Sequence, residues 1–234
     1  MNLRKRLLTY LVSKQMTDPN LTDITLVLDK SGSMFDLAKA TISGVNEFVH
    51  EQQKAPGDCN FSLVQFDTTY EPGYSGPIGK FPDLDSSRYV PGGMTALWDA
   101  MGRSIVAAGE RFKKLPEEKR PGKVIFVIYT DGFENFSHEY NQASLKALVE
   151  RQRDVYKWDF IFLGANQDAV LTAKSFGIQN SMSVAATVGG THAMYASTSS
   201  LITAKRAVFD AAEAAKLNYS TSDRKKQQEE GAKT

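Results

Sequence analysis

The sequence predicts one doubly wound α/β domain, in which a mostly parallel central sheet is flanked by helices. Short apolar runs alternate with longer segments of helical periodicity along most of the chain, an order typical of strand–helix–strand units. The runs 124–129 and 160–163 are apolar throughout, as strands covered on both faces are. With 234 residues, the chain is long enough to bury a sizeable core in a single domain.

The composition narrows the classes of site and partner. Lys and Arg number 28 against 27 Asp and Glu, so we expect no dominant basic surface and no nucleic-acid partner. The single cysteine, Cys59, excludes an internal disulfide and a zinc site built on several cysteines. The three histidines are far apart in the sequence, which disfavours a histidine-rich metal site. A cytoplasmic protein fits these features best.

The amino terminus predicts a short amphipathic helix with a linker, over residues 1–20. Four leucines fall on one face of such a helix, namely Leu3, Leu7, Leu8 and Leu11. This face would pack on the body of the protein or on a partner, and a basic membrane-surface helix remains the alternative. The apolar run is too short for a signal peptide, and no later run is long enough to span a bilayer.

The first strand is predicted over 24–28 and the second over 61–66, with a helix between them from about 35 to 53. Strand, helix and strand in this order imply a right-handed crossover and a parallel pair. The segment 70–91 is rich in proline and glycine, so we expect it to be irregular, with a short edge strand around 78–81.

The remaining elements continue the alternation to the end of the domain. We expect, in order, a helix opened by 92–95, a strand at 124–129, a helix at 139–154, a strand at 160–163, a short helix between Asn166 and Gly177, a strand at 182–186, and a long helix with Leu201, Ala204, Val208, Ala211 and Ala215 on one face. Residues 218–234 are polar and predict a disordered tail. The domain is therefore expected to cover 21–217.

Polar side chains follow two of the predicted strands and open one helix. Asp29, Ser31 and Ser33 come directly after the first strand, Thr95 lies in the glycine-rich loop at 92–95, and Asp131 follows the strand 124–129. Because the carboxyl ends of parallel strands meet at one edge of a sheet, we expect all five around one crevice. Their oxygens suit Mg²⁺, with Mn²⁺ and Ca²⁺ as alternatives.

Each of these motifs also has a purely structural interpretation. Ser31-Gly32-Ser33 is typical of a turn with a helix cap, Thr95 alone suits a cap, and Asp131-Gly132 is a common turn. The joint occurrence at one predicted sheet edge favours a metal site. If the hydroxyls bind directly, the first shell is largely neutral, and the ion stays electrophilic toward a carboxylate from another protein.

The three motifs together resemble the metal-ion-dependent adhesion site of von Willebrand factor A-type (VWA) domains. The resemblance rests on Asp-x-Ser-x-Ser, Gly-Gly-x-Thr and Thr-Asp-Gly in this order, and it extends over roughly residues 23–215. It implies the Rossmann-like VWA fold, of the small stand-alone type found in bacteria and phages. It also implies that Ser31, Ser33 and Thr95 bind the metal, that Asp29 and Asp131 lie near it, often through water, and that the ligand is an acidic side chain of a protein partner.

Three functions follow as hypotheses. The first is a divalent-metal-dependent protein-binding module without catalysis. The second is a Mg²⁺-dependent hydrolase or phosphotransferase using Asp29, although no Gly-x-Ser-x-Gly motif is present. The third is a metal-independent interaction scaffold that binds through the amino-terminal helix or the 70–91 loop. The aromatic residues in 133–136 would form part of the rim of the site or cover the sheet.

Overall fold

The computed structural model describes residues 17–165 and 169–233. Its centre is a six-stranded sheet in the order β3-β2-β1-β4-β5-β6. Neighbouring strands are parallel except β2 and β3, which are antiparallel. The strands are β1 (Asp18–Asp29), β2 (Asp58–Phe66), β3 (Tyr70–Pro77), β4 (Pro121–Thr130), β5 (Asp159–Ala165) and β6 (Asn180–Val184). The predicted doubly wound, mostly parallel sheet is confirmed.

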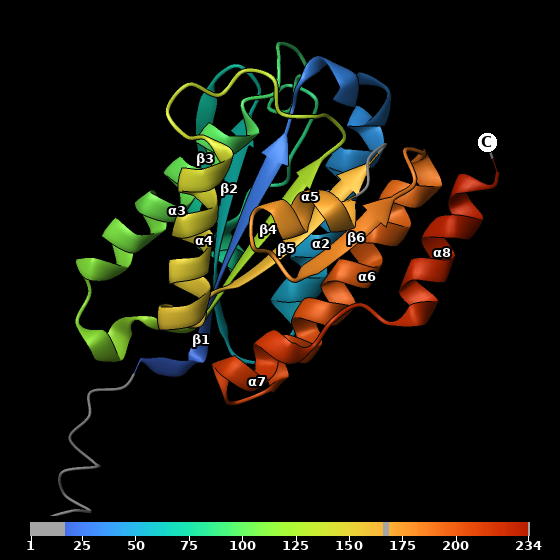
Figure 1. The fold of residues 1–234 in the computed structure, drawn as a ribbon. Helices are drawn as coiled ribbons and strands as arrows, with labels where there is room; N and C mark the ends of the chain where they lie inside the picture. Colours follow the sequence, from blue (N-terminus) through green and yellow to red (C-terminus); the bar gives the residue numbers. More distant parts are fainter. Residues whose placement is uncertain (1–16, 166–168, 234) are drawn as a thin grey trace, which may run out of the picture.

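Helices cover both faces of the sheet (Figure 1). They are α2 (Ala38–Lys54), α3 (Leu97–Lys113), α4 (Gln142–Tyr156), α5 (Ala169–Ser175), α6 (Val188–Ala207), α7 (Ala211–Lys216) and α8 (Thr221–Gly231), with short 3-10 helices η1 (Gly32–Leu37), η2 (Ile78–Lys80) and η3 (Glu117–Lys119). Among the described residues, none of the helices is long and apolar enough to cross a bilayer.

Alternate residues of the central strands enter two separate cores. On β4, Ile125 and Val127 belong to the core that contains α2 and α6, whereas Phe126 and Ile128 belong to the core that contains α3, α4 and α5. Because successive side chains of a strand point to opposite faces, a strand that is apolar throughout has to be covered on both. The apolar runs in the sequence predicted this correctly.

The order of the strands places a crevice at the carboxyl ends of β1 and β4. The chain leaves β1 through α2, on one face, to β2, and then returns through α3, on the other face, to β4 on the far side of β1. Ligands of open α/β sheets bind at such a reversal, outside the carboxyl ends of the strands. Asp29 ends β1 and Asp131 follows β4, so both residues lie at this edge.

Two predicted elements of the first half differ in the structure. The predicted helix at 35–53 begins as the 3-10 helix η1, and the α-helix starts only at Ala38. The edge strand expected at 78–81 is wrong, because β3 occupies Tyr70–Pro77 and residues 78–80 form η2. Proline and glycine are tolerated on an edge strand that pairs on one side only, and a register irregularity near Val64 accommodates them.

The carboxyl-terminal region is more ordered than predicted. The single long helix expected through Ala215 is interrupted after Ala207, and Asp210 caps the separate helix α7. The disordered tail expected over 218–234 is wrong for α8, which begins with a Ser220–Asp223 capping box. Gln227 is buried, donates to the carbonyl of Gly190 and accepts from the N–H of Ala185. Hydropathy alone did not show this anchor, because a glutamine provides it.

The amino-terminal helix predicted within residues 1–20 lies mostly outside the described residues, and 18–20 belong to β1 rather than to a linker. The helix cap predicted at Asn166 also lies outside them. Gly177 has a φ of +76° just beyond α5, which confirms its predicted place at a helix terminus.

Candidate functional site

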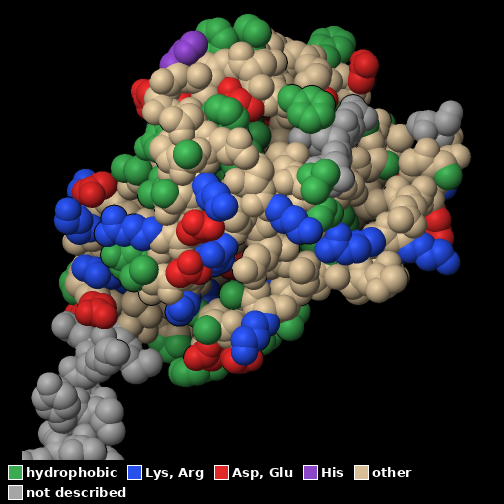
Figure 2. All heavy atoms as spheres, viewed as in Figure 1, with side chains coloured by type: hydrophobic (Ala, Val, Ile, Leu, Met, Phe, Trp, Pro, Cys, Tyr) green, Lys and Arg blue, Asp and Glu red, His purple; other side chains and the backbone are tan. Residues whose placement is uncertain are grey.

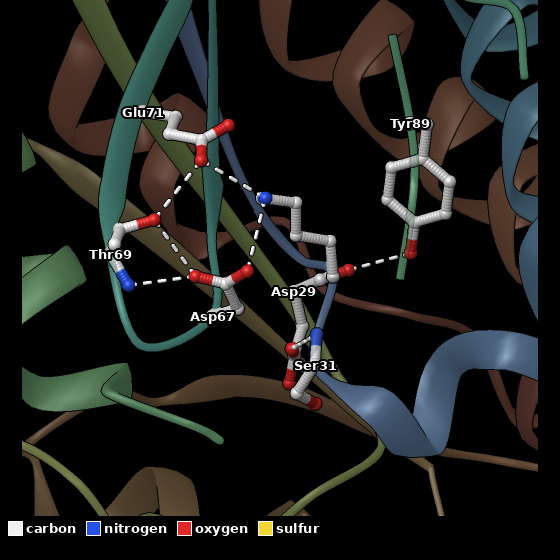
Figure 3. A network of polar contacts seen from close by, with 7 residues as sticks. Asp29, Ser31, Asp67, Thr69, Glu71 and Tyr89 are labelled. Atoms are coloured by element: carbon white, nitrogen blue, oxygen red, sulfur yellow. Dashed lines mark hydrogen bonds and ion pairs between the residues drawn. The ribbon is translucent and has the colours of Figure 1, made fainter. Parts of the chain in front are cut away.

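Asp29 joins the carboxyl ends of β1 and β4 beneath the candidate site. Its side chain is completely buried. One carboxylate oxygen accepts the N–H of Ser31 at 2.6 Å, and the other accepts the hydroxyl of Thr130 at 2.5 Å. Both oxygens therefore hold the backbone that carries the other predicted ligands, and Figure 3 shows the first of these contacts.

The glycine-rich loop is fastened to the turn after β1 by backbone hydrogen bonds. The N–H of Gly92 donates to Lys30, and the N–H of Gly32 donates to Gly93. Gly93 has a φ of +71°, and a Cβ there would lie 2.4 Å from the hydroxyl of Thr68, so only glycine fits. The buried Tyr89 also donates its hydroxyl to the carbonyl of Asp29 at 2.6 Å (Figure 3).

Oxygen atoms of the four other predicted residues converge above Asp29. The hydroxyls of Ser31 and Ser33 lie 3.2 Å apart, and Ser33 donates to a carboxylate oxygen of Asp131 at 2.5 Å. A Cβ at Gly132 would lie 3.0 Å from the Thr95 hydroxyl and 3.5 Å from the Ser33 hydroxyl. Glycine at this position therefore keeps the space between these hydroxyls open. The structure brings all five predicted residues together.

Burial of the two carboxylates makes their negative charge costly. Desolvation raises the pKa of Asp29 to about 6, against the hydrogen bonds from Thr130 and Ser31, and the nearby charge of Asp131 adds to the rise. Desolvation also raises the pKa of Asp131, although its hydrogen bond from Ser33 opposes this. A cation placed among these oxygens would compensate both charges.

The basic residue inside the motif does not provide this compensation. The ammonium of Lys30 lies 3.0 Å from Asp67 and 3.0 Å from Glu71, and both acids also bond to the hydroxyl of Thr69 (Figure 3). Lys30 therefore forms its ion pairs with acids of the β2–β3 hairpin rather than with Asp29 or Asp131.

The donor set fits a hard divalent cation. Hydroxyl and carboxylate oxygens are the ligands that Mg²⁺ takes in proteins. Among the described residues, no group of three or more His, Cys, Asp or Glu side chains could hold a metal ion, so the hydroxyls would have to contribute. The oxygens that face the shared space come from Ser31, Ser33, Thr95 and Asp131. Asp29 would act on the ion indirectly, because its carboxylate holds the N–H of Ser31 and the hydroxyl of Thr130 in place.

The loop between β4 and α4 (residues 131–141, the β4–α4 loop) holds Thr95 in place. Asn135 accepts the N–H of Thr95 through its side chain at 2.8 Å, and its own N–H donates to the carbonyl of Thr95 at 3.0 Å. Glu134 accepts the N–H of Trp98, in the first turn of α3, at 2.9 Å. The loop that begins with Asp131 is therefore bonded to the segment that carries Thr95.

Sequence reasoning missed these supporting residues. The sequence shows Thr130 only as the first residue of the Thr-Asp-Gly motif, and Tyr89 lies in a segment whose prolines and glycines give no sign of a buried side chain. Nothing local indicates the roles of Glu134 and Asn135, because the next helix, α4, begins only at Gln142. Their actual partners lie about 40 residues earlier in the chain.

A cavity without any of these residues lies at the other end of the molecule. It has a volume of about 630 Å³, and α3, α4 and the start of β4 line it with residues that include Val106, Leu148 and Trp158. None of the five predicted site residues lines it.

Comparison with known proteins supports the fold. No family model matches the sequence, and no curated protein matches it. Among solved structures, the pilus adhesin SpaC from Lactobacillus rhamnosus GG is similar over 78% of this chain, with a TM-score of 0.56 and 14% identity. A von Willebrand factor type A protein from Catenulispora acidiphila is similar over 81%, with a TM-score of 0.51 and 14% identity. Proximal thread matrix protein 1 from the mussel byssus is similar over 80%, with a TM-score of 0.50 and 16% identity.

These likenesses show that the chain has a VWA-like fold, as the resemblance of its motifs implied. The matched regions are 30%, 43% and 47% of the respective solved chains, so this chain spans less than half of each. At such identities the comparison concerns the fold alone.

Proposed function

We propose that this chain is a divalent-metal-dependent protein-binding module, which holds Mg²⁺ at the carboxyl ends of β1 and β4 and captures an acidic side chain of a protein partner. The observation that carries the proposal is the convergence of the Ser31, Ser33 and Thr95 hydroxyls with Asp131, above a buried Asp29. The VWA-like fold and its occurrence in a pilus adhesin support a binding role.

The chemistry of the proposed capture follows from the donor set. Neutral hydroxyls reduce the positive charge of a bound cation less than carboxylates do, so the ion keeps its attraction for an outside anion. When bound, the ion supplies the electrophile for the partner's carboxylate. The chain's own residues orient the hydroxyls, through Asp29 and the β4–α4 loop, and keep the two acids close enough to favour the cation.

The environment of Asp29 favours this role over catalysis. A nucleophilic carboxylate has to approach its substrate, but Asp29 has no exposed surface and both its oxygens accept hydrogen bonds from the protein. In the proposed function Asp29 is a positioning residue. The cytoplasmic location and the absence of a nucleic-acid partner remain predictions from composition.

Thermal unfolding with and without Mg²⁺ tests the metal site. A ligand that binds the native state alone stabilises it by about 2.7 kcal/mol at a hundredfold excess over its dissociation constant, so the melting temperature should rise. Ser33→Ala should reduce the rise, because it removes one predicted ligand. Ser43→Ala is the matched control, since that hydroxyl donates to the carbonyls of Lys39 and Ala40 within α2, and it should leave the rise unchanged. No rise at millimolar Mg²⁺ or Mn²⁺ would contradict the metal site.

Affinity capture tests the partner. Wild type and a Ser31→Ala/Ser33→Ala variant would be used as bait, with Mg²⁺ or with chelator. We expect a protein retained only by the wild type in Mg²⁺. Retention that chelation does not change would contradict metal-dependent capture and favour the metal-independent scaffold.

A further inference from the structure

Three large apolar side chains that are exposed to water come from the segments that carry the predicted metal ligands. They are Phe35 in η1, Met94 in the glycine-rich loop and Phe133 in the β4–α4 loop, with exposed fractions of 72%, 45% and 67%. Each lies within two residues of a predicted metal ligand. Because those ligands converge on one space, the segments that carry the three side chains meet at it. We call them the apolar rim.

The backbone that carries the apolar rim is held in place. Met94 precedes Thr95, whose N–H and carbonyl both bond to Asn135. Phe133 precedes Glu134, whose carboxylate accepts the N–H groups of Trp98, Phe136 and Ser137. Met94 and Phe133 are thus exposed on segments that hydrogen bonds hold in place, and the exposure of all three side chains is an unfavourable contact with water until a partner covers them.

At the carboxyl ends of the strands, attraction of an anion would depend on the bound metal ion. Figure 2 shows Lys and Arg side chains across the middle and lower part of the visible face, whereas the end above the carboxyl ends of the strands shows hydrophobic, acidic and histidine side chains. Lys30 is paired with Asp67 and Glu71. An acidic partner would thus gain its electrostatic attraction from the ion, while its flanks would meet apolar surface.

A shallow groove continues the apolar rim on one side. It begins at Phe133, has a volume of about 390 Å³, and is lined by side chains that include Trp98, Glu134 and Phe176. The groove has room for an apolar side chain next to the one that reaches the metal.

We propose that the partner presents its carboxylate from a segment with large apolar side chains on both sides of the acid, and that these pack on Phe35, Met94 and Phe133. The inference rests on the proposed function. Covering the apolar rim excludes water from the ion, which strengthens the bond between ion and carboxylate. A segment with polar flanks would lose hydrogen bonds to water on this surface and find no replacement there.

Two pools of fluorescent nine-residue peptides test the inference. Both carry one central Asp and the same net charge. In one pool the four neighbouring positions are Leu, Ile or Phe, and in the other they are Ser, Asn or Gln. We expect the apolar-flanked pool to bind about tenfold more tightly in Mg²⁺, the change that burial of roughly 60 Å² of additional apolar surface corresponds to. Chelator should abolish the binding.

A double variant links the preference to the apolar rim. Phe35→Ser/Phe133→Ser should lose the tenfold preference and keep the Mg²⁺-induced rise in melting temperature. Phe209→Ser/Val155→Ser is the matched control, because these side chains are 71% and 64% exposed elsewhere, and it should keep both properties.

Equal binding of the two pools, no binding of either while Mg²⁺ still raises the melting temperature, or an unchanged preference in the double variant would each overturn the inference. Failure of Mg²⁺ to raise the melting temperature of the wild type would instead contradict the proposed function.

Discussion

Glu134 provides a strict test of how the site is held together. Its carboxylate accepts four hydrogen bonds, from the N–H of Trp98 at 2.9 Å, the N–H of Phe136 at 2.8 Å, and the N–H and hydroxyl of Ser137 at 2.6 and 2.7 Å. Glu134→Ala removes all four. A hydrogen bond to a charged group contributes about 1.5–3 kcal/mol when buried. Since water can replace part of these half-buried contacts, we expect a total loss of about 2–4 kcal/mol in the free energy of unfolding.

Urea denaturation without added metal measures this loss. Glu139→Ala is the matched control, since it removes the same charge from the same loop, but its side chain is exposed and, among the described residues, forms its ion pair with Arg103. We expect a loss below about 1 kcal/mol for that exposed pair. In Mg²⁺, Glu134→Ala should also reduce metal stabilisation more than Glu139→Ala does, because its loop carries Asp131 and holds Thr95. Equal losses in the two variants would refute the reasoning.

Three further predictions concern the body of the domain. Burial raises the pKa of Asp23 to about 6, although its ion pair with Arg111 opposes the rise, so between about pH 4 and pH 6 the native state holds a proton that the unfolded chain has released. Stability should fall by about 3 kcal/mol as pH rises between these values, and Asp23→Asn should remove this part of the fall; an identical pH profile would contradict it. Gly44→Ala should lower the free energy of unfolding by about 1–3 kcal/mol, because the new Cβ would lie 2.1 Å from the ring of Tyr195 in α6. Gly109→Ala is its control, since the space around Gly109 is open, and it should be neutral or stabilising in thermal melts. Lys205→Met should cost about 3–5 kcal/mol in urea, because it takes the cationic partner away from Asp159 of β5, which is only 12% exposed, and the donor away from the carbonyls of Ala214 and Leu217. Lys216→Met breaks an exposed pair and should cost under about 1 kcal/mol; similar costs for both variants would contradict this prediction.

The fold was predictable because apolar periodicity records burial. The fully apolar runs became the central strands β4 and β5, and the alternation with helices implied their parallel arrangement. The edge strand β3 was misplaced, because its residues are mostly exposed and so carry no pattern of alternate burial. The helix α8 was missed for a related reason, since Gln227 anchors it by hydrogen bonds to backbone groups rather than by apolar area.

The candidate site was predictable as a set of residues but not as a network. Its members follow strands or open a helix, so topology alone implies that they meet. The contacts that fix them connect distant positions, such as Thr130 with Asp29 and Asn135 with Thr95. Nothing local in a sequence identifies such pairs, because each partner also has an ordinary role as a strand end or a loop residue.

The central claim is that the oxygens at the carboxyl ends of β1 and β4 hold a divalent cation. Anomalous X-ray diffraction from crystals grown with Mn²⁺ tests it most directly, because Mn²⁺ substitutes for Mg²⁺ at oxygen sites and can be located without assumption. We predict an anomalous peak about 2 Å from the hydroxyls of Ser31, Ser33 and Thr95. A crystal in millimolar Mn²⁺ with no peak among these hydroxyls, or with its peaks only elsewhere on the protein, would contradict the account.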